Sequence, residues 1–74
     1  MSEGARQDAL LVDARGLRCP WPVLRLARAM RDETRVRLLA DDPKTYSEVA
    51  ALAAANGWTF YEVEGHFVVE RPAS

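Results

Sequence analysis

The sequence has 74 residues, of which 49% are hydrophobic and 28% charged, and its formal net charge is −1. This composition is typical of one globular domain and excludes a disordered or fibrous chain, although a chain this short buries only roughly 60% of its unfolded surface. A single cysteine excludes an internal disulfide, and together with a single histidine it excludes a structural zinc site, so we expect a free thiol and no bound metal.

The first part of the chain predicts a strand followed by a helix. Residues 8–14, DALLVDA, are interpreted as a strand, and Arg15-Gly16 as the turn after it. From Pro22 to about Arg31, apolar side chains recur at helical spacing. They are Val23, Leu26, Ala27 and Met30. Two acidic residues follow, and because acids are unfavourable at the C-terminal end of a helix, we expect the helix to stop before them.

A second strand and a second helix are predicted next. The strand is RVRLLA, residues 35–40, and the helix lies within DDPKTYSEVAALAAANG, ending at the left-handed stop Asn56-Gly57. Two helix starts stay open. Either Asp42 caps the helix with Pro43 at its first position, or Thr45 and Glu48 form a capping box.

The last part of the chain predicts a β-hairpin. Residues 58–63 and 66–71 are rich in β-branched and aromatic side chains, and only Glu64-Gly65 separates them. The element order is therefore βαβαββ. We predict an α/β (α+β) two-layer sandwich in which a four-stranded mixed sheet carries both helices on one face, as a single domain over residues 1–74 with its core at about 9–71.

The stretch RCPWPVLR places Cys19 between Arg18 and Pro20, at the start of the first helix. The free amides and the dipole of a helix start favour an anion. The dipole alone, about 0.3 to 1 kcal/mol, lowers a thiol pKa by less than one unit. We therefore expect Arg18, Arg15 and an amide hydrogen bond from Trp21 to lower the thiol pKa further.

The prolines around the thiol exclude two kinds of cysteine enzyme. A dithiol oxidoreductase needs a second cysteine where this chain has Pro22. Cys19 and Arg25 have the Cys-x5-Arg spacing of phosphatase loops, but such loops bind phosphate through successive backbone N–H groups, and two prolines remove two of these donors. What is left for one exposed thiol is to hold a group covalently and pass it on, with sulfur as a persulfide the obvious candidate.

These residues resemble the TusA/SirA-like sulfur carrier proteins, whose signature is Cys-Pro-x-Pro at the start of the first helix. Here the signature is LRCPWP, preceded by VDARGL, and ADDP after the second strand is a further similarity. The resemblance implies a sulfurtransferase in the sense of a persulfide carrier, with Cys19 as the catalytic residue. It also implies that Gly16, Arg18, Pro20 and Pro22 support it.

The same resemblance implies a set of partners. The donor would be a cysteine desulfurase or a rhodanese-like protein, and an acceptor protein would take the sulfur for tRNA thiolation, molybdenum cofactor synthesis or sulfur oxidation. We expect no cofactor besides the transient persulfide, no direct contact with nucleic acid, and a monomer when free. The start of the sequence lacks the apolar run of a signal peptide and no stretch is long enough for a membrane span, so we expect a cytoplasmic protein without membrane contact.

A docking surface is expected next to the thiol. At 100° per residue, Trp21, Arg25 and Arg28 project from the side of the first helix opposite its apolar residues, and Arg15 lies nearby in the sequence. Tryptophan and arginine are enriched at interface hot spots. The alternative is that Trp21 folds over the local surface.

Two other function classes stay open at this stage. Residues 1–37 carry eight arginines and five acidic residues, whereas residues 38–74 are net acidic, so the basic half could bind RNA. The protein could also be a non-catalytic interaction or regulatory module whose cysteine senses redox state. RNA binding that survives Cys19→Ser would favour the first, and partner binding unaffected by loss of the thiol would favour the second.

Overall fold

The computed structural model describes residues 9–72 and confirms the predicted element order. Residue 8 of the first predicted strand lies outside the described residues, and the other predicted boundaries agree with the structure within two residues. The elements are β1 (Leu10–Asp13), α1 (Trp21–Ala29), β2 (Arg35–Leu39), α2 (Thr45–Asn56), β3 (Thr59–Val63) and β4 (His66–Glu70).

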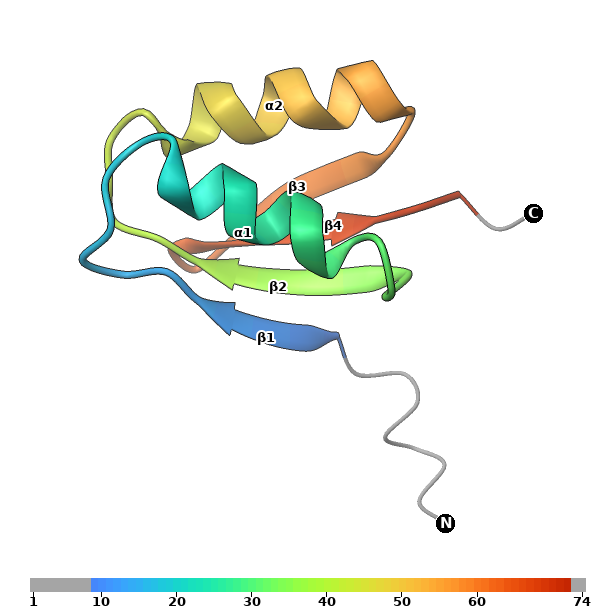
Figure 1. The fold of residues 1–74 in the computed structure, drawn as a ribbon, viewed down its shortest axis with the longest axis horizontal. Coiled ribbons are helices and arrows are strands. Elements are labelled where there is room, and N and C mark those ends of the chain that lie inside the picture. The colour runs from blue at the N-terminus through green and yellow to red at the C-terminus, as the bar shows by residue number, and fades with distance from the viewer. Residues whose placement is uncertain (1–8, 73–74) are drawn as a thin grey trace, which may run out of the picture.

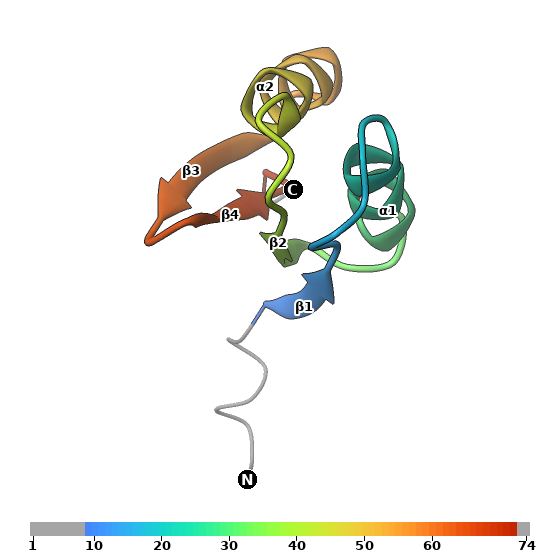
Figure 2. The same cartoon turned by 90° about the vertical axis from the view of Figure 1, so that its left-hand side faces the viewer.

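The four strands form one mixed sheet in the order β1-β2-β4-β3. β1 and β2 are parallel, and β4 is antiparallel to both β2 and β3. Both helices lie on the same face of the sheet, and no element of residues 9–72 covers the opposite face (Figure 1, Figure 2). The predicted two-layer sandwich is therefore confirmed.

The core lies between the sheet and the two helices. Its residues recur at the spacing expected for the covered face of each strand and helix. In β2 the alternate residues Val36 and Leu38 are fully buried while Arg37 between them is exposed, as expected for a strand with one covered face. α1 contributes Leu26 and Met30, on one helical face. The other buried members of this cluster are Ala14, Val49, Phe67 and Val69.

The ends of the elements correct one detail of the sequence analysis. α2 begins at Thr45 with Lys44 as its N-cap, so Pro43 does not occupy the first helical position. The Thr45 hydroxyl has no hydrogen-bond partner within residues 9–72, so the Thr45–Glu48 capping box is not formed. The predicted stop at Gly57 is confirmed by its left-handed φ of 72°.

The parallel pairing of β1 and β2 determines where the cysteine lies. The carboxyl ends of neighbouring parallel strands meet at the same edge of a sheet. The pairing extends past the strands, since the Ala14 amide donates to the Leu39 carbonyl at 2.7 Å. The loop from β1 to α1, which carries Cys19, therefore lies beside the loop from β2 to α2.

Candidate functional site around Cys19

Cys19 lies two residues before the first residue of α1, Trp21. Pro20 is the N-cap of the helix, the Cys19–Pro20 peptide bond is cis, and Pro22 is buried in the first turn. The Trp21 amide donates to the Arg18 carbonyl at 2.8 Å, which closes a turn around the cysteine. The expectation that this amide donates to the thiol is therefore wrong.

Two aspartates hold the cysteine loop against the loop that leads to α2. The Gly16 amide donates to Asp41 Oδ1 at 3.0 Å, and the Cys19 amide donates to Asp42 Oδ2 at 3.0 Å. The other oxygen of Asp42 accepts the Lys44 amide at 2.8 Å. Gly16 has a φ of 85°, which an L side chain adopts only with strain, so the turn depends on glycine.

The sequence analysis gave Asp42 a role only at the start of the second helix and gave Asp41 no role of its own. Their contacts with Gly16 and Cys19 cross from one loop to the other, and no local helix rule predicts such contacts. The one available signal is the position of ADDP directly after a strand that is parallel to β1, because residues that follow neighbouring parallel strands come together.

The partly buried Cys19 side chain lies between two hollows of different size. The first is an open groove of about 610 Å³, lined by both loops: Gly16, Leu17, Arg18, Cys19, Asp41, Asp42, Pro43 and Lys44. The second is a narrow crevice between the starts of α1 and α2, without room for a water molecule, lined by Cys19, Pro20, Pro22, Val23, Thr45 and Glu48.

The electrostatic environment of the thiol is acidic. Its pKa is raised above the ordinary cysteine value, first by a hydrogen bond to the Glu48 carboxylate and then by desolvation and by the charges of Glu48 and Asp42. Lys44 opposes this shift. The predicted lowering of the thiol pKa is therefore wrong, because a carboxylate from α2 outweighs the helix start.

The two arginines that were expected to lower the thiol pKa act elsewhere. Arg15 forms a two-point ion pair with Asp13, with N···O distances of 2.9 and 2.8 Å, and this pair lowers the pKa of Asp13 to about 2. The charge of Arg18 contributes to lowering the pKa of Asp42. Gly16 and Arg18 both line the groove beside Cys19.

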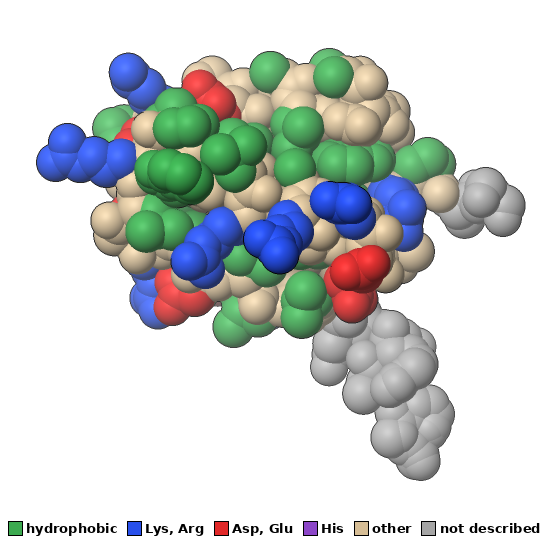
Figure 3. Space-filling model, viewed as in Figure 1, with side chains coloured by type: hydrophobic (Ala, Val, Ile, Leu, Met, Phe, Trp, Pro, Cys, Tyr) green, Lys and Arg blue, Asp and Glu red, His purple; other side chains and the backbone are tan. Residues whose placement is uncertain are grey.

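The outer side of α1 carries the other predicted site residues. Trp21 is 59% exposed and Leu24 is 48% exposed, and Arg25 and Arg28 are exposed one and two turns along. We call these four residues the α1 face. Figure 3 shows apolar side chains gathered over the first half of α1 with a row of basic side chains beside them. Arg25 and Arg28 also line a shallow hollow of about 450 Å³ with Val12 and Ala29.

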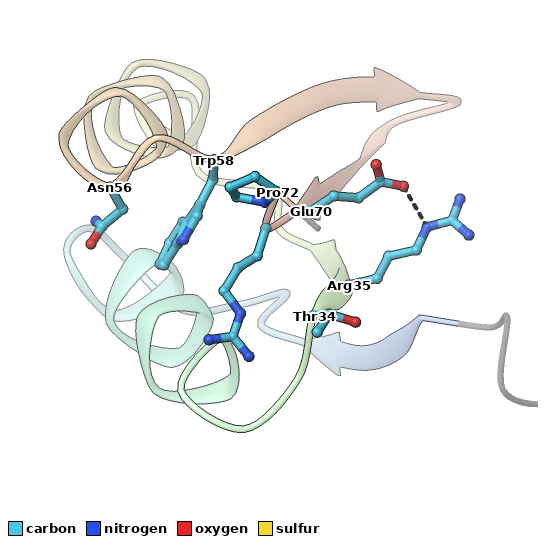
Figure 4. Close-up of a pocket in the computed structure, with 7 residues that line it drawn as sticks. Thr34, Arg35, Asn56, Trp58, Glu70 and Pro72 are labelled. Atoms are coloured by element: carbon cyan, nitrogen blue, oxygen red, sulfur yellow. Dashed lines mark ion pairs between the residues drawn. The ribbon is translucent and has the colours of Figure 1, made fainter. Parts of the chain in front are cut away.

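A larger hollow of about 770 Å³ lies at the opposite end of β2 from Cys19 (Figure 4). Trp58, Arg71 and the Arg35–Glu70 ion pair of 2.9 Å line it. The sequence analysis did not single out this region. Because it lies at the amino end of β2, it is separate from the groove and the crevice beside the thiol.

Within residues 9–72, no group of three or more histidine, cysteine, aspartate or glutamate side chains could hold a metal ion. No helix in the same part of the chain is long and apolar enough to cross a membrane.

Comparison with known protein families gives a match over most of the chain. The sequence model of the family described as sulfurtransferase TusA matches residues 11–70, which spans every strand and helix and includes Cys19. No curated protein matches the chain.

Proposed function

Because the chain belongs to the sulfurtransferase TusA family, whose members carry sulfur and work with donor and acceptor proteins, we propose that Cys19 receives a sulfane sulfur as a persulfide and relays it to an acceptor protein. The observation that carries the proposal is the position of the single thiol of the sequence. It lies at the start of α1, at the edge of an open groove, in a loop fixed by Asp41 and Asp42.

The transfer conserves the oxidation level of the pair of proteins. The Cys19 thiolate attacks the outer sulfur of a persulfide on the donor, a new S–S bond forms, and the S–S bond of the donor breaks. Its electron pair leaves with the donor sulfur, which takes up a proton. Attack by an acceptor thiolate on the outer sulfur of charged Cys19 repeats the step in the other direction. No cofactor is required besides the transient persulfide.

The α1 face is the proposed docking surface for these partner proteins. An exposed tryptophan next to exposed arginines is characteristic of interface hot spots. A cysteine desulfurase or a rhodanese-like protein is the proposed donor, and tRNA thiolation or a related sulfur pathway is the proposed end use. Since a free thiol persists in a reducing compartment, we propose that the protein works in the cytoplasm.

Intact-mass measurement tests the carrier function. The protein is incubated with a cysteine desulfurase and cysteine without reductant, and we expect an adduct of one sulfur atom that disappears with dithiothreitol. Cys19→Ser is the matched control and should remain unmodified. The desulfurase is then removed and the charged protein is incubated with an acceptor protein. The intact mass should return to that of the protein with a free Cys19 thiol.

The proposal fails if no sulfur donor produces the adduct. It also fails if the adduct forms equally on Cys19→Ser. A regulatory module with a redox-sensing thiol would give oxidised Cys19 with peroxide but no transferable sulfur, so the second incubation distinguishes it from a carrier.

A further inference from the structure

The two hollows beside Cys19 differ in size and in charge. The crevice is too narrow for a water molecule, and Thr45 and Glu48 of α2 form its polar wall. Thr45 is only 3% exposed, and its Oγ1 has no hydrogen-bond partner among residues 9–72. The groove is open, and its charged lining residues are the cationic Arg18 and Lys44 and the acidic Asp41 and Asp42. Cys19 is the residue that belongs to both.

We propose that the crevice holds the Cys19 sulfur of the discharged carrier against Glu48, and that the outer sulfur of the charged carrier occupies the groove beside Arg18 and Lys44. This inference rests on the proposed carrier function and adds a position for each of the two states. Glu48 then shields the thiol while the carrier is empty, and the transferable sulfur is presented on the open side.

Charge explains why the discharged sulfur faces the crevice. Cys19 and Glu48 both line the crevice. Hydrogen bonding to the Glu48 carboxylate, then desolvation and the charges of Glu48 and Asp42, raise the pKa of the thiol and so favour its neutral form. Lys44 is the opposing charge. The remaining wall of the crevice is apolar, from Pro20, Pro22 and Val23, and therefore provides no stabilisation for a thiolate. The thiolate is the nucleophilic form, so the thiol in this position is held in its unreactive form.

Size and charge explain why the outer sulfur lies in the groove. A space that cannot hold a water molecule cannot accept an additional sulfur atom, which is larger. A persulfide is also more acidic than a thiol, so its outer sulfur is an anion near neutral pH and is repelled by Glu48. The groove has the room that the crevice lacks. Of its charged lining residues, Arg18 and Lys44 attract this anion, whereas the carboxylates of Asp41 and Asp42, which accept backbone amides, repel it.

The buried Thr45 hydroxyl has a role in the step between the two states. A buried hydroxyl without a partner is costly, and it gains a hydrogen bond when an acceptor appears beside it. Such an acceptor appears when Cys19 transfers its thiol proton to Glu48 and becomes a thiolate. Thr45 then donates to the sulfur during attack on the donor persulfide, and the proton passes from Glu48 to the departing donor sulfur, so that no proton is gained or lost.

Alkylation of the reduced protein with iodoacetamide tests the crevice without any sulfur donor. Rates are measured from about pH 6 to pH 10, on both sides of the ordinary cysteine pKa. Glu48→Gln should accelerate alkylation at neutral pH by about threefold to tenfold, because each unit by which the pKa falls multiplies the thiolate fraction by about ten. Thr45→Val should slow alkylation by about threefold. Glu62→Gln, which removes an exposed carboxylate from β3, is the matched control and should stay within about twofold of the wild type.

Alkylation of the charged protein tests the groove. Cys19 is first converted to the persulfide by a cysteine desulfurase, and Glu48→Gln should then change the alkylation rate by less than about twofold, because the outer sulfur is no longer beside Glu48. Circular dichroism of each variant verifies that α2 is intact.

Three outcomes overturn the inference. If reduced Cys19 is alkylated at the same rate in Glu48→Gln as in the wild type, Glu48 does not act on the thiol. If the rate is the same in Thr45→Val, Thr45 does not act on it either. If Glu48→Gln accelerates alkylation of the persulfide as much as alkylation of the thiol, both sulfurs lie in the same environment. If no persulfide forms, the proposed function and the groove assignment fail together, while the thiol rates still decide the crevice.

Discussion

Asp42 connects the loop that carries Cys19 to the loop that precedes α2. Its two carboxylate oxygens accept the backbone amides of Cys19 and Lys44, at 3.0 and 2.8 Å. These two hydrogen bonds lower the pKa of Asp42, since both are stronger to the ionised carboxylate than to the neutral acid. The position of the thiol therefore depends on the charge of one side chain that itself exchanges neither sulfur nor a proton.

Asp42→Asn should destabilise the protein in a pH-dependent way. Because the folded-state pKa of Asp42 is lowered, its carboxylate stabilises the fold above the ordinary aspartate pKa of about 3.9, and this contribution is lost as the pH falls through the lowered value. We expect the variant to unfold at a lower temperature than the wild type at neutral pH. The difference should shrink as the pH falls below about 4. Thermal unfolding followed by circular dichroism over this pH range measures both effects.

A matched change elsewhere separates this effect from the loss of a negative charge. Asp32 is exposed in the turn after α1, so Asp32→Asn should leave the unfolding temperature nearly unchanged at every pH. Curves for Asp42→Asn and the wild type that stay parallel down to acidic pH would contradict a role for the ionised carboxylate.

At the scale of elements, α1 combines two surfaces with different tasks. Val23, Leu26 and Met30 are buried against the sheet, whereas Trp21 and Leu24 point away from it and are exposed. A large exposed aromatic side chain stabilises the fold little, because most of its surface stays in water. The outer surface of α1 is therefore free to serve partner proteins without cost to the core.

Trp21→Ala should separate docking from stability. We expect the free energy of unfolding to change by no more than about 0.5 kcal/mol, as for other exposed positions. The rate at which a cysteine desulfurase charges Cys19 should fall, since hot-spot truncations cost about 2 kcal/mol or more of binding free energy. Leu11→Ala is the control, because Leu11 is 56% exposed in β1 and pairs with Arg37, on the uncovered side of the sheet. Charging rates that fall equally in both variants would contradict docking through Trp21.

The elements themselves could be predicted from the sequence, but the environment of the thiol could not. The helical spacing of Val23, Leu26 and Met30 and the turn at Glu64-Gly65 are local patterns, and local patterns predict element type and order. The thiol pKa depends instead on Glu48, which reaches Cys19 only because α1 and α2 pack side by side. A single sequence gives no distance between two helices. The prediction of a lowered thiol pKa therefore included the start of the first helix but not the carboxylate of Glu48.

At the scale of the whole molecule, the sheet order explains why one end of the protein carries the chemistry. β1 and β2 are parallel neighbours, so the loops that follow them meet at one edge, and both helices begin at this same edge (Figure 1). The acidic groups that hold and shield Cys19 come from the second loop and α2, whereas the arginines of the α1 face are exposed further along α1. The molecule thus presents a thiol with acidic surroundings next to a basic docking surface.

This distribution of charge predicts salt-sensitive charging by the donor. Exposed charges steer association when they complement the partner, and their effect is screened over about 8 to 10 Å at physiological ionic strength. Replacing both Arg25 and Arg28 by glutamine should therefore slow charging by a desulfurase several-fold at low salt, and the deficit should disappear as salt is raised.

Arg37→Gln is the control, because Arg37 is exposed in β2 between two residues whose side chains enter the core, and so faces the uncovered side of the sheet. Stopped-flow charging rates across a salt series provide the measurement. A deficit that is the same at all salt concentrations would indicate that the two arginines act through direct contacts and not through steering, and an unchanged rate at low salt would remove them from the docking surface.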